Sequence, residues 1–534
     1  MKKSLKFLSI LLLIAAILVG CNSNKGSSSS EAYDLENITF PLEEKVTLKF
    51  MTQSSPLAPS DPNEKLIFKR LEEKTGVHIE WQNYTREAFI EKRNLALASG
   101  ELPDAIFDAG FSNYDLLKYS KDGLIIPVED LIDNYMPNLK KVLEQRPEYR
   151  SYITAPDGHI YGFPWIEELG HGIERIQVVG GLPWINVEWL DNLGLDMPNN
   201  YEELKEVLIA FKTQDPNGNG EPDEIPMGAI INGWDQDPAI ILGSIGLGDN
   251  GDHTIVTEEG TVLFTAMQEG YKDQIKYLNE LYELGLIDEE AFEQDWNKFI
   301  SKGDRYGLYF TWDKANVTGM NDKFDVLPPL EGPTGERIIV QQNGGVGFDR
   351  GRMVITSANK NLELTAKWID QLYEPFQSVQ NNWGTYGDTE QQNIFELDEE
   401  TGMLKHLPLE GTAPVELREK TNAGGPLAIL EEYYGTVTTK PDDAAWRLDL
   451  LQKYIVPYIK NENYYPHVYY SLEEIEELTK IETDLYDYVN RKRAEWIRNG
   501  KIEEEWDEYL QQLEKLNISR WLQLKQEVYD RTVN

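Results

Sequence analysis

Oxygen-bearing side chains recur at every second position between Asp215 and Asp223, around glycines that let the backbone turn sharply. Oxygen donors at this spacing, with glycine at the sixth position, are typical of an EF-hand calcium loop. The predicted ligands are Asp215, Asn217, Asn219, Glu221 through its backbone carbonyl, Asp223, and Glu224. Glu224 would replace the usual carboxylate of position twelve, which here is Pro226. The loop therefore predicts a static structural calcium site, and a metal-free turn is the alternative.

Aromatic side chains are placed at expected loops and strand ends, where a core would not need them. The chain has 13 Trp and 28 Tyr. Flat rings in loops can stack on the apolar faces of sugar rings, while neighbouring amides and carboxylates bind the hydroxyls. The candidates for this role are Trp165, Asn232, Trp234, Trp312, Trp383 and Tyr386. For each aromatic residue, simple packing is the alternative.

The first part of the chain alternates between strand and helix patterns. Strands are predicted at 45–53, 77–81 and 102–108, with helices at 63–74 and 86–98. This alternation predicts an open α/β lobe with a parallel sheet, in which ligands bind beyond the carboxyl ends of the strands. Gln53, Ser54 and Asp108 lie at such ends and are further candidates, with a plain turn as the alternative.

The elements that must position the calcium loop and the later aromatics follow. Strands are predicted at 178–186, 225–231, 306–311, 344–348 and 353–356, and helices at 187–192, 199–211, 278–299 and 362–372. From residue 444 to residue 530 the chain reads as nearly all helical. The size of the chain indicates two lobes. We expect residues 45–163 plus 313–352 in the N-terminal lobe, and residues 164–312 plus 353–534 in the C-terminal lobe.

The chain start indicates export. Three lysines precede the apolar run Phe7–Val19, which has the length of a signal-peptide core and is too short for a comfortable membrane span. The run closes on Leu18-Val19-Gly20-Cys21, which resembles the bacterial lipobox, and Cys21 is the single cysteine of the chain. Residues 1–20 are therefore expected to be a lipoprotein signal peptide, and residues 21–44 a lipidated cysteine with a flexible, Ser-rich tether. An ordinary signal peptide is the alternative.

Composition and missing motifs narrow the function. The formal charge of −41 over 534 residues argues against a nucleic-acid partner. The sequence has no Walker loop, no G-x-S-x-G elbow and no H-E-x-x-H zinc motif. Gly246–Gly251 matches G-x-G-x-x-G, but strands predicted at 254–256 and 261–264 follow it as a hairpin instead of a helix. The sequence does not exclude the two catalytic carboxylates of a glycosidase, because they are defined by their distance in space and not by a fixed spacing in the sequence.

Several short motifs together resemble one family, the bacterial extracellular solute-binding lipoproteins of carbohydrate ABC transporters. Besides the lipobox they are Leu102-Pro-Asp104, 157–164 (DGHIYGFP), 189–195 (WLDNLGL), 506–509 (WDEY) and 529–531 (YDR). The resemblance covers essentially the whole mature chain and includes alginate-oligosaccharide-binding and LplA-like lipoproteins. The calcium loop is similar to that of the alginate-binding members, which also place a carboxylate directly after the ninth position.

The resemblance implies a two-lobed α/β fold of the type II periplasmic-binding-protein class, with a ligand cleft between the lobes and a helical C-terminal extension. It implies a monomeric receptor, anchored by lipid to the extracellular face of the membrane, that delivers an oligosaccharide to ABC permease subunits and catalyses no reaction. The alternatives are a secreted polysaccharide hydrolase or lyase, and a surface adhesion or sensor protein. A neutral sugar suits the acidic chain. A uronate-containing sugar is the alternative, because its carboxylates could pair with Arg305, Arg350 and Arg352.

Overall fold

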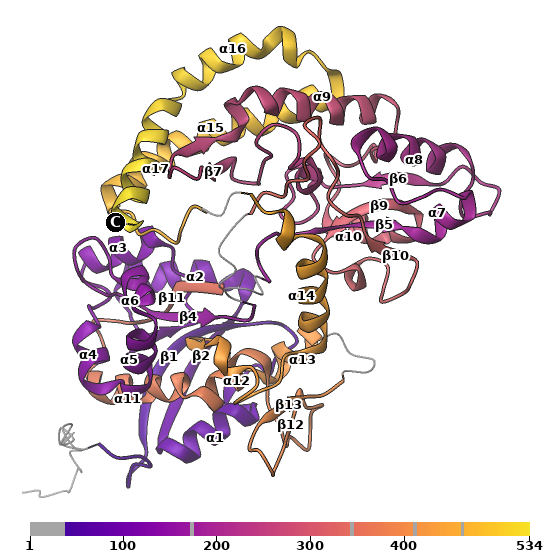
Figure 1. Cartoon of the computed structure of the whole chain (residues 1–534). Coiled ribbons are helices and arrows are strands. Elements are labelled where there is room, and N and C mark those ends of the chain that lie inside the picture. The colour runs from indigo at the N-terminus through magenta and orange to yellow at the C-terminus, as the bar shows by residue number, and fades with distance from the viewer. Residues whose placement is uncertain (1–37, 171–175, 342–346, 409–413, 461–463, 534) are drawn as a thin grey trace, which may run out of the picture. The chain divides into compact units, whose positions relative to one another are not determined.

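The computed structural model describes residues 38–170, 176–341, 347–408, 414–460 and 464–533. Residues 40–534 form one compact unit with two main sheets (Figure 1). The predicted signal peptide, Cys21 and the Ser-rich segment lie outside the described residues. Within the described ranges, no helix combines the length and apolar character needed to cross a membrane.

The larger sheet has six strands in the order β14, β4, β11, β3, β1, β2. Their bounds are β1 Val46–Ser54, β2 Val77–Thr85, β3 Ala105–Phe107, β4 Phe163–Glu167, β11 Gly347–Ile355 and β14 Leu427–Ile429. As predicted, β1 is parallel to β2 and β3, and the connections contain helices α1 (Leu66–Thr75) and α2 (Arg86–Ser99). The carboxyl ends of β1 and β3 therefore lie side by side, which brings Ser54 and Asp108 to the same edge of the sheet.

Seven further helices belong to the parts of the chain around this sheet. They are α3 Asn113–Lys121, α4 Glu129–Tyr135, α5 Pro137–Gln145, α6 Pro147–Ile153, α11 Leu362–Asp370, α12 Pro375–Trp383 and α13 Pro414–Thr421. Of these, α12 packs against β14, and α11 packs against α4 and α5. A small hairpin of β12 (Phe395–Leu397) and β13 (Leu404–His406) follows α12.

The second sheet has four strands in the order β10, β5, β9, β6. Their bounds are β5 Leu182–Asn186, β6 Ile225–Gly228, β9 Tyr306–Thr311 and β10 Phe324–Val326. Helices α7 (Val187–Leu193) and α8 (Tyr201–Thr213) precede β6. Leu204, Leu208 and Phe211 recur on one face of α8 and are buried in the same apolar cluster as Met227 of β6. The expected calcium loop thus joins a well-packed helix to β6, an edge strand of this sheet.

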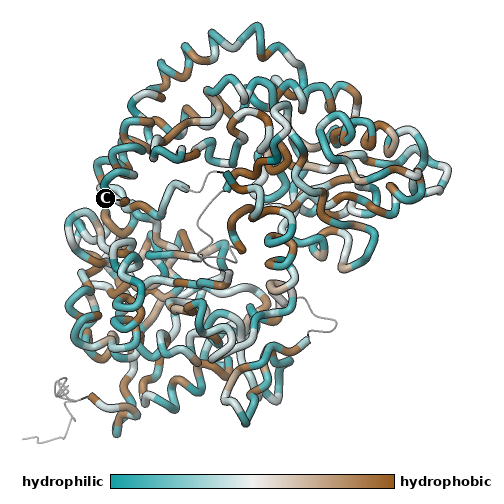
Figure 2. Tube along the Cα trace, viewed as in Figure 1, coloured by the Kyte–Doolittle hydropathy of each residue, from teal (hydrophilic) through white to brown (hydrophobic). Residues whose placement is uncertain are grey.

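Long helices form the C-terminal region, as predicted. They are α14 Asp442–Tyr454, α15 Leu472–Asn499, α16 Ile502–Lys515 and α17 Ile518–Val533. A capping box of Ser471 and Glu474 starts α15. Figure 2 shows teal and brown alternating along α15–α17, the pattern of amphipathic helices. Their apolar faces carry Trp496 and Trp521 into the apolar cluster of the second sheet, and α15 and α16 pack against α9 (Glu269–Glu283).

Some predicted bounds are wrong. The expected helix at 278–299 is instead α9, followed after a gap by α10 (Trp296–Ser301). The chain leaves α9 at Gly285, whose φ is +66°, and Ile287 then bridges to Met227 of β6. The predicted strand at 344–348 falls mostly outside the described residues, and β11 runs on from Gly347. The hairpin after the glycine-rich turn is confirmed as β7 (Thr254–Val256) and β8 (Val262–Phe264).

The α/β class with a helical C-terminal extension is confirmed. The exact division of the chain between the two lobes stays a prediction. Strand pairing nevertheless places residues 353–355 and 427–429 in the six-stranded sheet, although we expected them in the C-terminal lobe. The reason is that β11 inserts between β3 and β4, and β14 pairs with β4, and no local pattern reveals either long-range pairing.

Candidate functional site

A tight loop after β6 presents one of the predicted aromatic residues. Its ends are Asn232, whose φ is +63°, and Asp237, whose Oδ2 accepts a hydrogen bond from the Asn232 backbone N–H at 2.6 Å. Asp237 Oδ1 also caps the following turn through the Ala239 N–H at 2.9 Å. Arg493 of α15, a buried residue, donates to both carboxylate oxygens of Asp237 at 2.7 and 2.8 Å and to Asn232 Oδ1 at 2.7 Å. One guanidinium therefore closes the loop at both ends.

The tip of this loop carries Trp234, which is 72% exposed. Its ring stacks on Trp312, with centroids 6.0 Å apart and planes 15° from parallel. Asp235 accepts a hydrogen bond from the Trp312 N–H at 2.8 Å, and burial raises the pKa of Asp235. The structure thus brings three predicted site residues, Asn232, Trp234 and Trp312, to one place. An exposed tryptophan stacked on a half-buried one, with a carboxylate beside them, can pack on a sugar ring and bind its hydroxyls.

Arg447 of α14 supports this pair, and the sequence analysis missed it. Its guanidinium carbon lies 3.5 Å from the centroid of the Trp312 ring. The same group donates to backbone carbonyls of Val179 at 3.0 Å, Gly180 at 2.9 Å and Trp312. Arg447 is buried, and burial lowers its pKa to about 9. The sequence did not indicate this role for Arg447, because its partners lie far away in the sequence.

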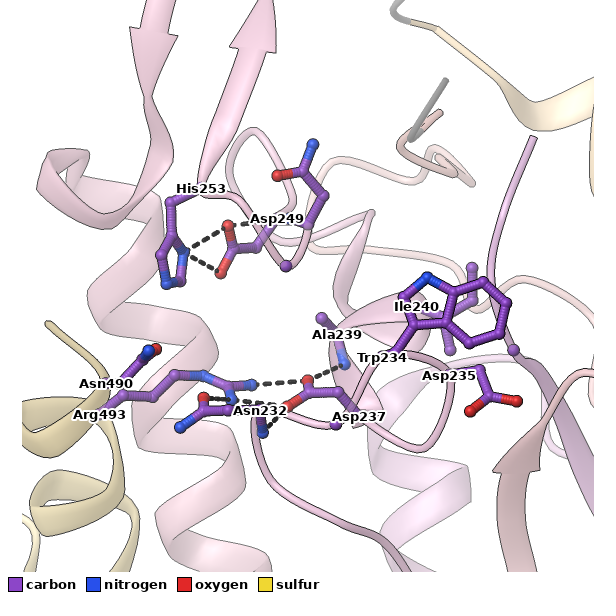
Figure 3. A pocket seen from close by; sticks show the side chains of 14 residues that line it. Asn232, Trp234, Asp235, Asp237, Ala239, Ile240, Asp249, His253, Asn490 and Arg493 are labelled. Carbon is purple, nitrogen blue, oxygen red and sulfur yellow. Dashed lines mark hydrogen bonds and ion pairs between the residues drawn. The ribbon is translucent and has the colours of Figure 1, made fainter. Parts of the chain in front are cut away.

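A polar pocket of about 90 Å³ lies behind the loop (Figure 3). Asn232, Trp234, Asp237, His253 and Arg493 are among the residues that line it. His253 Nδ1 is 2.9 Å from Asp249 Oδ2. Asp249 is buried, which acts to raise its pKa, but the adjoining His253 and a hydrogen bond from Thr265 outweigh this and lower it.

The edge of the six-stranded sheet gathers a second group of predicted residues. Gln53 Nε2 donates to the Asp108 carbonyl at 2.9 Å, and Asp108 has a φ of +51°. Asp108 Oδ1 is 2.9 Å from Arg352, whose guanidinium lies 5.6 Å from the centroid of the Trp165 ring. Ser54 Oγ hydrogen-bonds the Asn83 side chain. Gln53, Asp108 and Trp165 are therefore connected, two of them through an arginine that sequence reasoning left out of this group.

Trp383 and Tyr386 have packing contacts that the sequence did not indicate. Trp383 is 9% exposed, and its Nε1 donates to Tyr434 Oη at 3.3 Å. Tyr434 in turn donates to Glu167 Oε1 at 2.6 Å, and burial raises the pKa of Glu167 to about 7. The Tyr386 ring lies under the Arg70 guanidinium at 4.5 Å. Trp383 belongs to an apolar cluster against which Trp165, Trp312 and Tyr386 pack, half-buried.

Comparison with known proteins decides the family. Residues 58–377 match the family described as bacterial extracellular solute-binding protein. The chain is also 59% identical over 517 residues to the fructooligosaccharide ABC transporter substrate-binding protein FusA of Streptococcus pneumoniae. This match covers 96% of each chain. This chain is a bacterial extracellular solute-binding protein.

Solved structures agree with this family. FusA in complex with kestose has a TM-score of 0.85 and 59% identity, covering 91% of this chain and 99% of that one. An EF-hand mutant of FusA in complex with fructo-nystose has a TM-score of 0.85 and 58% identity, with the same coverage. The two-lobed α/β fold is confirmed, and the relatives are transporter substrate-binding proteins, not enzymes. The hydrolase or lyase alternative therefore has no support from this solute-binding protein's relatives.

The predicted calcium loop of this solute-binding protein folds as a tight turn between α8 and β6. Asp215 accepts hydrogen bonds from the backbone N–H groups of Asn219 and Gly220 at 3.1 and 3.0 Å. Asp223 Oδ1 accepts from the side-chain amides of Asn217 and Asn219 at 3.2 and 3.0 Å. Among the described residues, no group of three or more His, Cys, Asp or Glu side chains is arranged to hold a metal. A calcium ion here would therefore need amide and backbone oxygens as well.

One atom of the loop indicates that such an ion fits. Glu224 Oε1 is buried and has no hydrogen-bond partner among the described residues. The pKa of Glu224 is raised by burial and by the charges of Asp223 and Asp215. A divalent cation would give Glu224 a partner and offset the repulsion among the three carboxylates. The side-chain oxygens of Asn217 and Asn219 accept the backbone N–H groups of Asn219 and Glu221 at 2.9 and 2.7 Å, and each oxygen has a second lone pair for an ion.

Proposed function

We propose that this solute-binding protein captures a fructooligosaccharide and delivers it to the permease of an ABC importer. The observation that carries the proposal is the Trp234–Trp312 pair, with Asp235 beside it and Arg447 beneath Trp312. The 59% identity to FusA over nearly the full length supports the sugar class. In this proposal the ligand lies between two lobes that close on it. The six-stranded sheet then supplies polar and aromatic groups from Gln53, Ser54, Asp108 and Trp165.

A neutral sugar fits the arginines better than a uronate does. Arg305 Nε donates to the Asp223 carbonyl at 2.7 Å. Arg350 is buried and donates to the Val468 carbonyl at 2.9 Å. Arg352 pairs with Asp108 at 2.9 Å. Each of the three arginines that could bind a sugar carboxylate is therefore already engaged, and a neutral chain needs none of them.

Location and cofactor belong to the same proposal. Cys21 carries the lipid that anchors the protein to the outer face of the membrane, and the tether ends before Phe40, because Leu42 already donates to the Thr75 carbonyl at 2.9 Å. The 215–224 loop holds calcium through the six predicted ligands, and the EF-hand named in the FusA structure supports this. The calcium has a structural role, because the loop joins α8 to β6 and does not include the aromatic pair. The receptor acts as a monomer, with no nucleic-acid partner.

Replacing Trp234 tests the proposed site. We expect Trp234→Ala to weaken kestose binding roughly tenfold or more, because the exposed stacking surface is lost. Trp296→Ala is the matched control, since Trp296 is also exposed, at 39%, but stacks on Phe299 of α10. Isothermal titration calorimetry gives both dissociation constants. Equal affinity of the Trp234 variant and the wild type would contradict the site.

A further inference from the structure

The pocket behind the Trp234 loop has polar groups that its own structure leaves unused. Arg493 Nε is buried without a hydrogen-bond partner, although the other guanidinium nitrogens bind Asp237 and Asn232. Arg493 is only 3% exposed, so bulk water does not solvate this nitrogen. A buried donor without a partner is unfavourable, the more so when it is charged. The pocket therefore favours an occupant that can accept a hydrogen bond.

Two more groups on the pocket wall complement this donor. His253 uses Nδ1 on Asp249, and its other ring nitrogen has no hydrogen-bond partner within the described part of the chain. With the proton on Nδ1, that nitrogen is an acceptor. Asn490 of α15 also lines the pocket, and the described residues offer its amide no hydrogen bond. A donor, an acceptor and an amide around one space suit hydroxyl groups, which both donate and accept.

The size and position of the pocket agree with a sugar unit. A volume of 90 Å³ holds about six to nine waters at roughly 10–15 Å³ each. This is of the order of one monosaccharide. Figure 3 shows Trp234 at one border of the pocket, with His253 and Arg493 on the opposite side. Trp234 is thus shared between the exposed stacking surface and the pocket.

We propose that this pocket binds one end of a longer neutral oligosaccharide, with Arg493 Nε, His253 and Asn490 contacting the hydroxyls of its terminal ring. The inference rests on the proposed function, because Trp234 must first hold the adjoining rings. It assigns α15 a direct part in selecting chain length. A shorter sugar would use the aromatic pair and leave the pocket to water.

The test compares two chain lengths in variants of Asn490. Asn490 is half-buried, and Asn490→Met places an apolar side chain at the pocket wall, whereas Asn490→Ala only removes the amide. We expect Asn490→Met to weaken fructo-nystose at least tenfold while kestose binding changes less than threefold. Asn490→Ala should weaken fructo-nystose in the same direction by a smaller factor. Asn499→Met on the exposed end of α15 is the matched control.

Other outcomes have distinct meanings. Dissociation constants within twofold of the wild type for both sugars would overturn the proposal and show that the pocket holds only water. An equal loss for both sugars, with altered tryptophan fluorescence, would also overturn it, because that pattern reports a displaced Trp234. Wild-type protein that binds neither sugar would contradict the proposed function itself, which separates the two failures.

Discussion

Buried charged side chains hold the aromatic residues of the candidate site in place. Arg447 lies against Trp312, and Glu167 reaches Trp383 through Tyr434. Each of these charges has its partners inside the protein, since Glu167 also accepts the Leu169 N–H at 2.7 Å. Removing one partner of a buried charge is costly, whereas an exposed pair contributes little. The orientation of the rings therefore depends on residues that need not touch the sugar.

We expect the free energy of unfolding to depend on pH through the buried residue Glu167. Its pKa in the folded protein, about 7, lies above the ordinary value of 4.5, so the folded state keeps a proton that the unfolded state loses. The free energy of unfolding should fall as pH rises from about 4.5 to about 7, by at most about 1.4 kcal/mol per pH unit. Glu167→Gln should remove this fall, measured by urea unfolding at several pH values. Glu399→Gln, at an exposed turn, should keep it, and an unchanged slope in Glu167→Gln would contradict the assignment.

At the scale of elements, the predicted calcium loop shows what a local pattern can predict. Donor spacing, the glycines and the helix before the loop are all encoded within a few residues, and the structure places them between α8 and β6 as expected. The same holds for the parallel strands β1, β2 and β3. Locally encoded features are readable from one sequence because their contacts lie at fixed, short separations.

Features made by distant contacts could not be predicted. Arg493 lies 261 positions from Asn232, and β11 enters a sheet whose other strands come from both ends of the chain. Arg493 falls on the apolar stripe of α15, four residues after Val489 and three before Trp496, so its burial has a local signal, but its partners have none. The loop that presents Trp234 was predicted as a site, but the guanidinium that closes it was not. Trp383 was chosen for its turn-like neighbours and is instead buried.

The calcium loop allows a matched comparison within one element. We expect calcium to raise the melting temperature, by an amount equivalent to roughly 2.7 kcal/mol at a hundredfold excess over its dissociation constant. Glu224→Gln should abolish most of this shift, because it removes the charge of a predicted ligand. Glu221→Gln changes the same charge on an exposed side chain but keeps the backbone carbonyl, and it should retain the shift.

Calorimetry of the protein after calcium removal by a chelator separates the effect of calcium on stability from its effect on sugar binding. A chelator should lower the melting temperature and leave the affinity for kestose unchanged, since the loop does not include the aromatic pair. Equal loss of both would contradict the structural role of calcium. No response of the wild-type melting temperature to calcium would contradict the metal site.

At the scale of the whole molecule, the chain combines an acidic body, two sheets and a helical C-terminal region that contributes to the site. The C-terminal helices are more than a packing layer, because α14 supplies Arg447 and α15 supplies Arg493. The sequence analysis assigned this region no function, and the structure places two of its arginines beside the candidate site. If the ligand contacts both sheets and these helices, as proposed, its binding can couple to a change in their arrangement.

The central claim is that the protein binds a fructooligosaccharide without altering it. The most direct measurement is isothermal titration of residues 31–534 with kestose and fructo-nystose, followed by chromatography of the recovered sugar. We expect saturable binding and intact sugar in every sample. Shortened sugar would show an enzyme, and the absence of binding to both sugars would contradict the account.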